Sequence, residues 1–165
     1  MKRSRWLIPL IIILLIAAVI VVGLQVRNQQ TEKETSGTIT LKSSGQEIKV
    51  PILDLDRENF SAETVNGKGE HFNNEYSGVE LQKLLKEQGI SLESVTEVKA
   101  AAADQYTAAY SGDEVREPGK LYLAVEVDGE AIQGIEGDDP GVQVIVFGDP
   151  DSRRLVRSLV TLEVM

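Results

Sequence analysis

The chain has 165 residues, enough for one domain of ordinary size and a short additional segment. It contains no cysteine, which excludes disulfide bonds, thiolate zinc sites, iron–sulfur clusters and covalently attached c-type haem. The chain has a single histidine, which argues against a histidine-based catalytic triad and against a metal site with several histidine ligands. With 26 acidic and 17 basic residues, the net charge of −9 disfavours nucleic acid as a partner.

The N-terminal region carries an uncharged apolar run at residues 6–24, WLIPLIIILLIAAVIVVGL. A helix needs about 20 such residues to cross a bilayer. The preceding segment, residues 1–5, contains Lys2, Arg3 and Arg5. We therefore expect a basic cytoplasmic stub, a single-pass membrane anchor at residues 6–24 and an extracytoplasmic remainder. A cleaved secretory signal, with an apolar core of about 7–15 residues, and a buried soluble helix are the alternatives.

Residues 25–36, QVRNQQTEKETS, are polar and show no periodicity, which predicts a flexible tether. The part of the chain beyond residue 30 keeps 13 of the 17 basic residues and all 26 acidic ones. Residues 37–165 are thus expected to form a strongly acidic domain that repels anionic lipid and nucleic acid.

Short runs typical of strands alternate with turn signals from residue 37 onward. GTITLK and QEIKVPI flank residues 43–45 and predict a first hairpin. FSAETV and EHF predict a second hairpin, with Asn66 and Gly67 in a type I′ turn. VTEVKAAA, YTAAY, KLYLAVEV and GVQVIVF predict further strands, and Asp128-Gly129 predicts a tight turn.

One helix is well marked in YSGVELQKLLKEQGI, residues 76–90. Ser77 and Glu80 have the spacing of a capping box at the start of a helix. Gly89 suits the left-handed position that follows the end of a helix. The buried stripe is expected to consist of Leu81, Leu84 and Leu85.

The C-terminal stretch predicts a short helical turn followed by a strand. Asp149-Pro150 would cap the helical turn, with proline at its first position. From Val156 to Val164 the residues alternate between two faces, and Arg157 lies on the face opposite Val156. The fold class is α+β: mostly β, with one well-marked helix and up to two short ones.

Three stretches in this order resemble the molybdopterin-binding domain of the sulfite oxidase family. They are YSGVELQKLLKEQGI, then VKAAAADQYTAAYSGDEV followed by LYLAVEVDGEAI, and finally GVQVIVFGDPDSRRLVRSLVTLEV. The similarity is good over about residues 76–165 and loose over 37–75. It implies a sulfite-oxidase-like fold and, by resemblance only, molybdopterin as the cofactor.

In the family's enzymes, a cysteine just before the helix ligates molybdenum. The corresponding stretch here, ETVNGKGEHFNNEYSG at residues 63–78, has none. His71, Asn73 and Asn74 are the nearest polar candidates for the pocket, and none of them supplies a soft anionic sulfur. We therefore expect no molybdenum, and we assign no catalytic residue and no metal ligand. For His71, a structural role in the hairpin is the alternative.

The family's Asp-Gly-Tyr motif corresponds here to Asp104, Gln105 and Tyr106, so glutamine replaces the glycine. Its position in the family makes Asp104 and Tyr106 further candidates for the pocket lining. The alternative is a turn aspartate and a half-buried strand tyrosine.

Three arginines lie close together near the C-terminus: Arg153, Arg154 and Arg157. The family's terminal loop wraps the pterin phosphate, and Arg157 falls where the family commonly has a lysine. The resemblance therefore implies an anion or pterin-phosphate site, which suits the paired donors of arginine. The alternative is a set of surface ion pairs with Asp138, Asp139, Asp149 and Asp151.

The leading functional hypothesis is a membrane-anchored extracytoplasmic domain that acts as a binding or interaction module without molybdenum redox catalysis. Its partner would be a small phosphorylated ligand or an extracytoplasmic protein. One alternative is an active molybdopterin-dependent oxidoreductase with an altered cofactor site. Another is a generic acidic surface domain whose pocket is filled with side chains.

Overall fold

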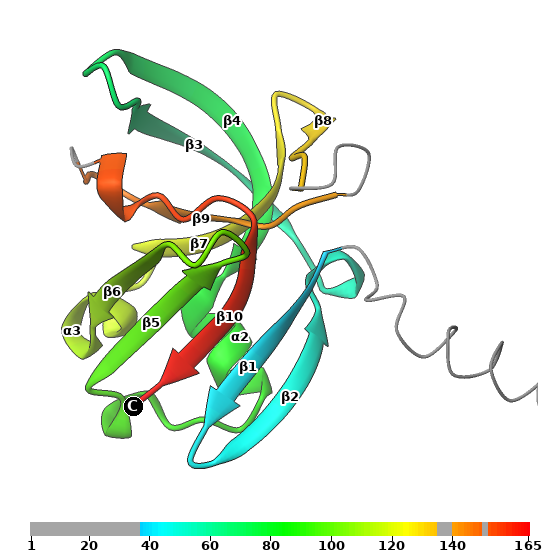
Figure 1. Cartoon of the computed structure of the whole chain (residues 1–165), viewed down its shortest axis with the longest axis vertical. Helices are drawn as coiled ribbons and strands as arrows, with labels where there is room; N and C mark the ends of the chain where they lie inside the picture. Colours follow the sequence, from blue (N-terminus) through cyan, green and yellow to red (C-terminus); the bar gives the residue numbers. More distant parts are fainter. Residues whose placement is uncertain (1–36, 135–139, 150–151) are drawn as a thin grey trace, which may run out of the picture. The chain divides into compact units, whose positions relative to one another are not determined.

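The computed structural model describes residues 37–134, 140–149 and 152–165, and Figure 1 shows their arrangement. All of these residues belong to one compact unit, Thr35–Met165. The predicted anchor at residues 6–24 and the predicted tether lie outside the described ranges. Among the helices within those ranges, none is long and apolar enough to span a bilayer.

The first sheet has five strands in the order β2-β1-β10-β5-β6. The C-terminal strand β10 lies in its centre, parallel to β1 and antiparallel to β5 (Figure 1). The first predicted hairpin is confirmed, because Ser44 and Gly45 connect β1 to β2 with φ angles of 51° and 77°. The strands are β1 (Thr38–Ser43), β2 (Gln46–Pro51), β5 (Glu97–Ala102), β6 (Thr107–Ser111) and β10 (Leu159–Val164).

The second sheet is built around β7, which pairs with β4, with β8 and with β9. Strand β3 pairs only with β4 along this order, and the two form a long hairpin (Figure 1). The strands are β3 (Glu58–Val65), β4 (His71–Glu80), β7 (Leu121–Val127), β8 (Glu130–Ala131) and β9 (Gln143–Val146).

Strand β7 is buried on both of its faces. Leu121, Leu123 and Val125 face the main core, which also contains apolar residues of the first sheet. Tyr122 and Ala124 face a second, smaller core on the other side of the sheet. In that second core, the ring of Phe60 stacks on Tyr122 with centroids 4.0 Å apart and on Tyr76 at 5.7 Å. The segment that follows β9 adds Leu155 to this core.

Helix α2 (Leu81–Glu87) confirms the predicted helix and its buried stripe of leucines. Gly89 has φ 75°, and the amide of Ile90 donates to the carbonyl of Leu85 at 2.9 Å, which forms a Schellman end. The predicted capping box is wrong, because the helix begins only after Glu80, without a side-chain cap. Ser77 lies in β4 opposite Glu126 of β7.

A second helix, α3 (Gly112–Arg116), begins with the capping box that α2 lacks. The Ser111 hydroxyl accepts a hydrogen bond from the Glu114 amide, and the Glu114 carboxylate accepts one from the Ser111 amide. Three short 3₁₀ turns complete the described helical segments: η1 (Ile52–Asp54), η2 (Leu92–Ser94) and η3 (Ser152–Arg154).

The turn between β3 and β4 differs from the predicted two-residue type I′ turn. Val65 pairs with His71, which leaves a loop at residues 66–70. The Asn66 side-chain oxygen accepts hydrogen bonds from the amides of Lys68 and Glu70 at 2.8 and 3.0 Å. These bonds cap a wider loop, in which Gly69 adopts the positive φ of 81°.

The terminal strand is shorter than predicted, because β10 begins at Leu159 rather than at Val156. Ser158 has a φ of 50°, and the pairing with β5 shifts between Leu159 and Thr161. This irregularity breaks the predicted alternation, so Val160 is exposed while Val156 is fully buried. Arg157 therefore lies before the strand and not on one of its faces.

We expect Gly78→Ala to lower the free energy of unfolding by about 2 kcal/mol, the range for overpacking a close contact. A Cβ at this position in β4 would lie 2.4 Å from the carbonyl oxygen of Leu123 in β7. Gly67→Ala is the matched control, because a Cβ there meets nothing within 4 Å and the φ is not positive. Urea unfolding of both variants measures the effect. Equal stability of the two would contradict the close contact.

Candidate functional site

A pocket of about 410 Å³ lies between the β3–β4 hairpin and the segment at residues 155–157. A neighbouring pocket of about 440 Å³ shares Val65, Asn66, Leu155 and Arg157 with it and adds Gly67 and Lys68. We call the two together the hairpin groove. The rest of its lining consists of Thr64, Phe72, Asn74, Tyr76, Val127 and Gln143.

The alternation along β4 decides which hairpin residues face the groove. Phe72, Asn74 and Tyr76 share the face that lines it. His71 and Asn73 occupy the intervening positions and are exposed, and neither is part of the described lining. Of the three predicted pocket candidates in this stretch, the structure thus places only Asn74 at the groove.

His71 lies on the outer face of the hairpin, where it contacts Glu63. Its Nδ1 lies 2.5 Å from the Glu63 carboxylate across the strand pair, and both side chains are 64% exposed. On the groove side, the Asn74 amide donates to Asp128 at 2.5 Å, and the amide of Glu75 donates to the same carboxylate at 2.9 Å. These two bonds lower the pKa of Asp128 and tie the hairpin to the turn after β7.

The groove differs in charge from the acidic chain around it. Arg157 and Lys68 both line it, and no carboxylate occurs among its described lining residues. In a chain of net charge −9, these two cations make the groove lining more basic than the chain as a whole. Such a groove favours an anion, and arginine can bind two oxygens of that anion at once.

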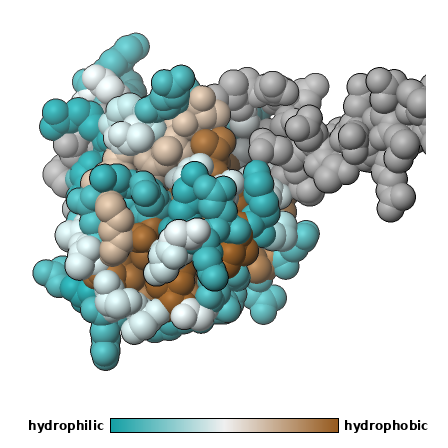
Figure 2. Space-filling model, turned by 60° about the horizontal axis from the view of Figure 1, so that its bottom comes forward, coloured by the Kyte–Doolittle hydropathy of each residue, from teal (hydrophilic) through white to brown (hydrophobic). Residues whose placement is uncertain are grey.

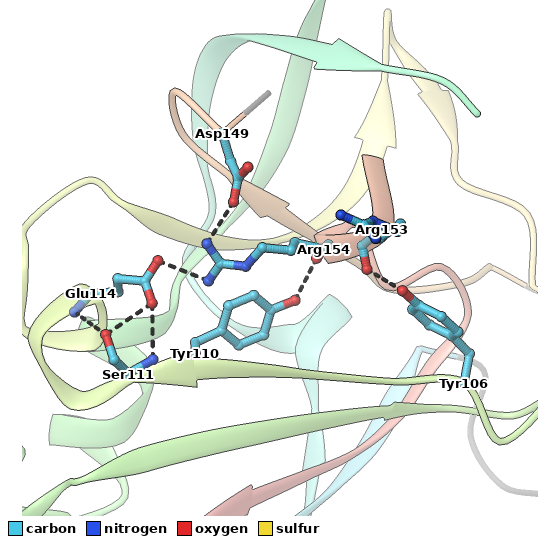
Figure 3. Close-up of polar contacts among 7 residues, drawn as sticks. All are labelled: Tyr106, Tyr110, Ser111, Glu114, Asp149, Arg153 and Arg154. Atoms are coloured by element: carbon cyan, nitrogen blue, oxygen red, sulfur yellow. Dashed lines mark hydrogen bonds and ion pairs between the residues drawn. The ribbon is translucent and has the colours of Figure 1, made fainter. Parts of the chain in front are cut away.

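Arg154 lies in a different environment, shown in Figure 3. Its guanidinium donates to Asp149 at 2.6 Å and to Glu114 of α3 at 2.8 Å, so each of its two terminal nitrogens has a carboxylate partner. The same group lies over the ring of Tyr110, 5.2 Å from the centroid. Arg154 therefore joins the segment after β9 to β6 and α3.

Two tyrosine hydroxyls reinforce this connection. The Tyr110 hydroxyl donates to the carbonyl of Arg154 at 2.6 Å, and the Tyr106 hydroxyl donates to the carbonyl of Arg153 (Figure 3). Asp104 accepts a hydrogen bond from the Tyr106 amide at 2.9 Å, as a turn aspartate does. Between them, Gln105 has φ 70°, the left-handed conformation that glycine adopts most readily.

The ionisation of this network follows from its contacts. Burial alone would raise the pKa of Glu114, but hydrogen bonds from the Ser111 amide, from Arg154 and from the Ser111 hydroxyl together lower it. Burial works against the charge of Arg154, yet Glu114 and Asp149 raise its pKa. Glu114 and Arg154 thus stabilise each other's charged forms, and the terminal nitrogens of Arg154 donate to protein carboxylates.

The three arginines of the predicted anion site therefore have different surroundings in the structure. Arg157 lines the groove, whereas Arg154 forms the ion pair with Asp149 that was the alternative reading, together with a second one to Glu114. Arg153 contributes its carbonyl to the contact with Tyr106. Asp138, Asp139 and Asp151, the other predicted acidic partners, lie outside the described residues.

Of the described groove lining, sequence reasoning predicted only Asn74 and Arg157 and missed the rest, including the cation Lys68 and the aromatic Phe72. Lys68 belongs to the loop that was predicted to be a tight turn. Phe72 shares its strand face with Asn74, so period-two alternation could have placed both on one side of the hairpin.

A comparison with protein families matches residues 25–161 to the family described as oxidoreductase molybdopterin binding domain. The chain belongs to this family. The resemblance that its three sequence stretches indicate is thereby confirmed. The match also extends N-terminally, over the region where the sequence similarity is loose.

Among solved structures, the sulfane dehydrogenase SoxCD from Paracoccus pantotrophus is similar to this chain, with a TM-score of 0.63 and 19% sequence identity. The match covers 80% of this chain but only 39% of the SoxCD chain, so the chain spans well under half of that relative. At this identity the likeness shows the mostly-β fold alone. No curated protein matches the chain.

We expect Arg154→Met to lower the free energy of unfolding at pH 7 by about 2 kcal/mol, less than for a fully buried pair. The substitution removes the cation that Asp149 and Glu114 share. Arg57→Met is the control, because the Arg57–Glu126 pair is more exposed and should contribute at most about 1 kcal/mol.

The effect of Arg154→Met should also depend on pH. Because the folded-state pKa of Glu114 is lowered, its stabilising contribution is present above the ordinary carboxyl pKa of about 4.3 and disappears as the pH falls through the folded value. The difference between wild type and variant should therefore shrink when urea unfolding is measured at pH 7, 5 and 3.5. A pH-independent difference would show that packing, and not the ion pairs, accounts for the loss.

Proposed function

We propose that the chain is a membrane-anchored, extracytoplasmic binding module on the molybdopterin-binding fold, and that it performs no molybdenum redox chemistry. One observation carries the proposal. The family's enzymes hold molybdenum through a cysteine thiolate, and this chain has no cysteine. Fold membership alone does not supply the missing ligand, because function depends on the residues of the site.

The side chains in the stretch where the family's enzymes carry the cysteine support this proposal. Residues 63–78 form most of the β3–β4 hairpin, where Asn74 is bound to Asp128 and His71 is bound to Glu63 on the outer face. An amide and an exposed imidazole do not fit the soft thiolate position of a molybdenum centre. Among the described residues, no group of three or more His, Cys, Asp or Glu side chains is placed to hold another metal ion.

The proposed ligand is a small phosphorylated molecule bound in the hairpin groove. Arg157 and Lys68 would contact its anionic group, while Arg154 is engaged by Asp149 and Glu114. A volume of about 410 Å³ for one of the two pockets is within the range for small-molecule sites. An open groove of this size also disfavours a generic acidic surface domain whose pocket is filled with side chains.

The second candidate function is a molybdopterin-dependent oxidoreductase with an altered cofactor site. Family membership favours it, as does the similarity to a sulfane dehydrogenase. In that case a partner molecule would have to supply the metal ligand that the cysteine provides in the family's enzymes. Molybdenum analysis separates the two candidates directly.

We expect far less than one molybdenum atom per chain when the full-length protein is purified from cells that make the cofactor. The reason is the missing thiolate. Metal analysis by mass spectrometry and pterin fluorescence of the same sample provide the measurement, and a molybdenum enzyme expressed in the same cells is the control. Close to one molybdenum per chain would refute the binding-module proposal and favour the oxidoreductase.

The anchoring part of the proposal predicts the position of the C-terminus. A reporter that is active only outside the cytoplasm should be active when fused after Met165, because the basic stub and the apolar run orient the N-terminus inward. Replacing Lys2, Arg3 and Arg5 by glutamate should reduce this activity. Activity of only a cytoplasmic reporter at the same position would contradict the proposed topology.

A further inference from the structure

Strand β2 forms one end of the first sheet, and among the described strands only β1 pairs with it (Figure 1). An open strand edge can pair with the backbone of another chain, and natural proteins usually block such edges with charged side chains or proline. With the sequence QEIKVP, β2 has both, since it contains one glutamate, one lysine and Pro51. The order of these residues determines which partner the edge accepts.

The turn between β1 and β2 determines which backbone groups of β2 point outward. Residues 44–45 form a two-residue turn with positive φ at both positions, between the paired residues Ser43 and Gln46. Residues that flank such a turn exchange hydrogen bonds with each other, and along the ladder this arrangement alternates. Gln46 therefore bonds to β1, whereas Glu47 and Lys49 direct their amide and carbonyl groups away from the sheet.

An antiparallel second copy of β2 fits this edge in one register without like charges facing each other. In that register Ile48 faces its own counterpart, and Glu47 exchanges backbone hydrogen bonds with Lys49 of the other copy. A register centred on Glu47 would oppose two glutamates. One centred on Lys49 would oppose two lysines and bring Pro51, which has no amide, into the ladder. The edge is therefore complementary to itself.

Charges on the outer face of the sheet already alternate from strand to strand and lead up to this edge. Lys42 of β1 contacts Glu47 at 2.7 Å. In the same row, Lys42 lies opposite Glu163 of β10, and Glu163 lies opposite Lys99 of β5. Lys49 of a second copy would continue this alternation across the junction, where opposite charges on neighbouring strands stabilise the pairing.

The core-facing side of β2 supplies an apolar contact at the centre of the pairing. Ile48 lies opposite Leu41, yet Ile48 is 39% exposed while Leu41 is only 1% exposed. In a register centred on Ile48, the two isoleucines would form a non-hydrogen-bonded pair, in which side chains approach most closely.

The other strands at the ends of the described sheets are not complementary to themselves in this way. Strand β3 has two glutamates and no basic residue, β6 has no charged residue, and the short β8 has only a glutamate. On the face shown in Figure 2, the hydrophobic areas are interrupted by hydrophilic residues. Among these described surfaces, the edge of β2 therefore suits a second copy best.

We propose that two copies of the chain associate by antiparallel pairing of their β2 strands, with Ile48 at the centre and Glu47 of each copy opposite Lys49 of the other. The first sheets of the two copies then form one continuous sheet. The inference is independent of the proposed ligand, because β2 contributes no residue to the described lining of the hairpin groove.

A single introduced cysteine tests the register, because the natural chain has none. Ile48→Cys places two thiols across a non-hydrogen-bonded pair, whose Cα separation of about 4.5 Å is compatible with a disulfide. The full-length protein in detergent micelles is treated with oxidised glutathione, and the covalent dimer is measured by non-reducing electrophoresis. Val160→Cys is the matched control, because Val160 is similarly exposed (37%) but lies in the central strand β10. We expect about fivefold more dimer from Ile48→Cys, because pairing holds its thiols together.

Charge reversal tests the pairing of Glu47 with Lys49. Glu47→Lys and Lys49→Glu each replace both opposite-charge pairs of the dimer by like-charge pairs. Each should therefore lower the association constant about tenfold in sedimentation equilibrium. An equimolar mixture of the two variants should restore association, because every reversed side chain then faces an opposite charge. Glu93→Lys and Lys86→Glu make the same charge changes at exposed positions of η2 and α2 and should have no effect.

Recovery of association in the mixture would show that charge pairing, and not misfolding of either variant, causes the loss. Equal yields of covalent dimer from Ile48→Cys and Val160→Cys would overturn the proposal. Association that neither charge reversal weakens would place the contact elsewhere and overturn it as well. A mixture that associates as weakly as its two components would contradict the antiparallel register.

Discussion

The burial of β7 on both faces is the constraint on which the rest of the domain depends. Its run from Leu121 to Val125 is apolar throughout, so each side of the second sheet must be covered. The first sheet and α2 contribute to the cover on one side. On the other side, the cover is smaller and includes Phe60, Tyr76, Ala62, Ile132 and Leu155. The hairpin groove lies where this second cover ends.

The segment that carries Leu155 has little regular structure and is held by specific contacts. The amide of Val144 in β9 donates to the carbonyl of Val156 at 2.9 Å, and the amide of Leu159 donates to Val142 at 2.8 Å. Arg154 pairs with Asp149 of the same segment and with Glu114, and the second of these ion pairs attaches the segment to α3. The segment that carries Arg157 is thus held in part by charged contacts that lie outside the groove.

Much of the fold could be predicted from sequence. Two similar motifs show that a local sequence pattern does not by itself determine whether a helix begins there. YSGVE at residues 76–80 and YSGDE at residues 110–114 both have the spacing of a capping box. Only the second forms one. In the first, Val79 is buried and pairs with Leu123, so strand pairing with β7 outweighs the local preference. In the second, Asp113 lies in the first turn, where a carboxylate favours a helix N-terminus.

The candidate site could be predicted only in part, because the position of an arginine in the sequence does not determine which carboxylates lie near it in the fold. Arg154 and Arg157 are one helical turn apart in sequence, yet one faces two carboxylates and the other a groove whose described lining has none. The carboxylate of Glu114 lies 40 positions from Arg154 and reaches it only through the folding of β6 and α3. An arginine already paired in this way gains little from an external anion, because binding would require exchanging one charged partner for another. The capacity for a new ligand therefore lies with Arg157 and with Lys68, which the hairpin loop brings to the same groove.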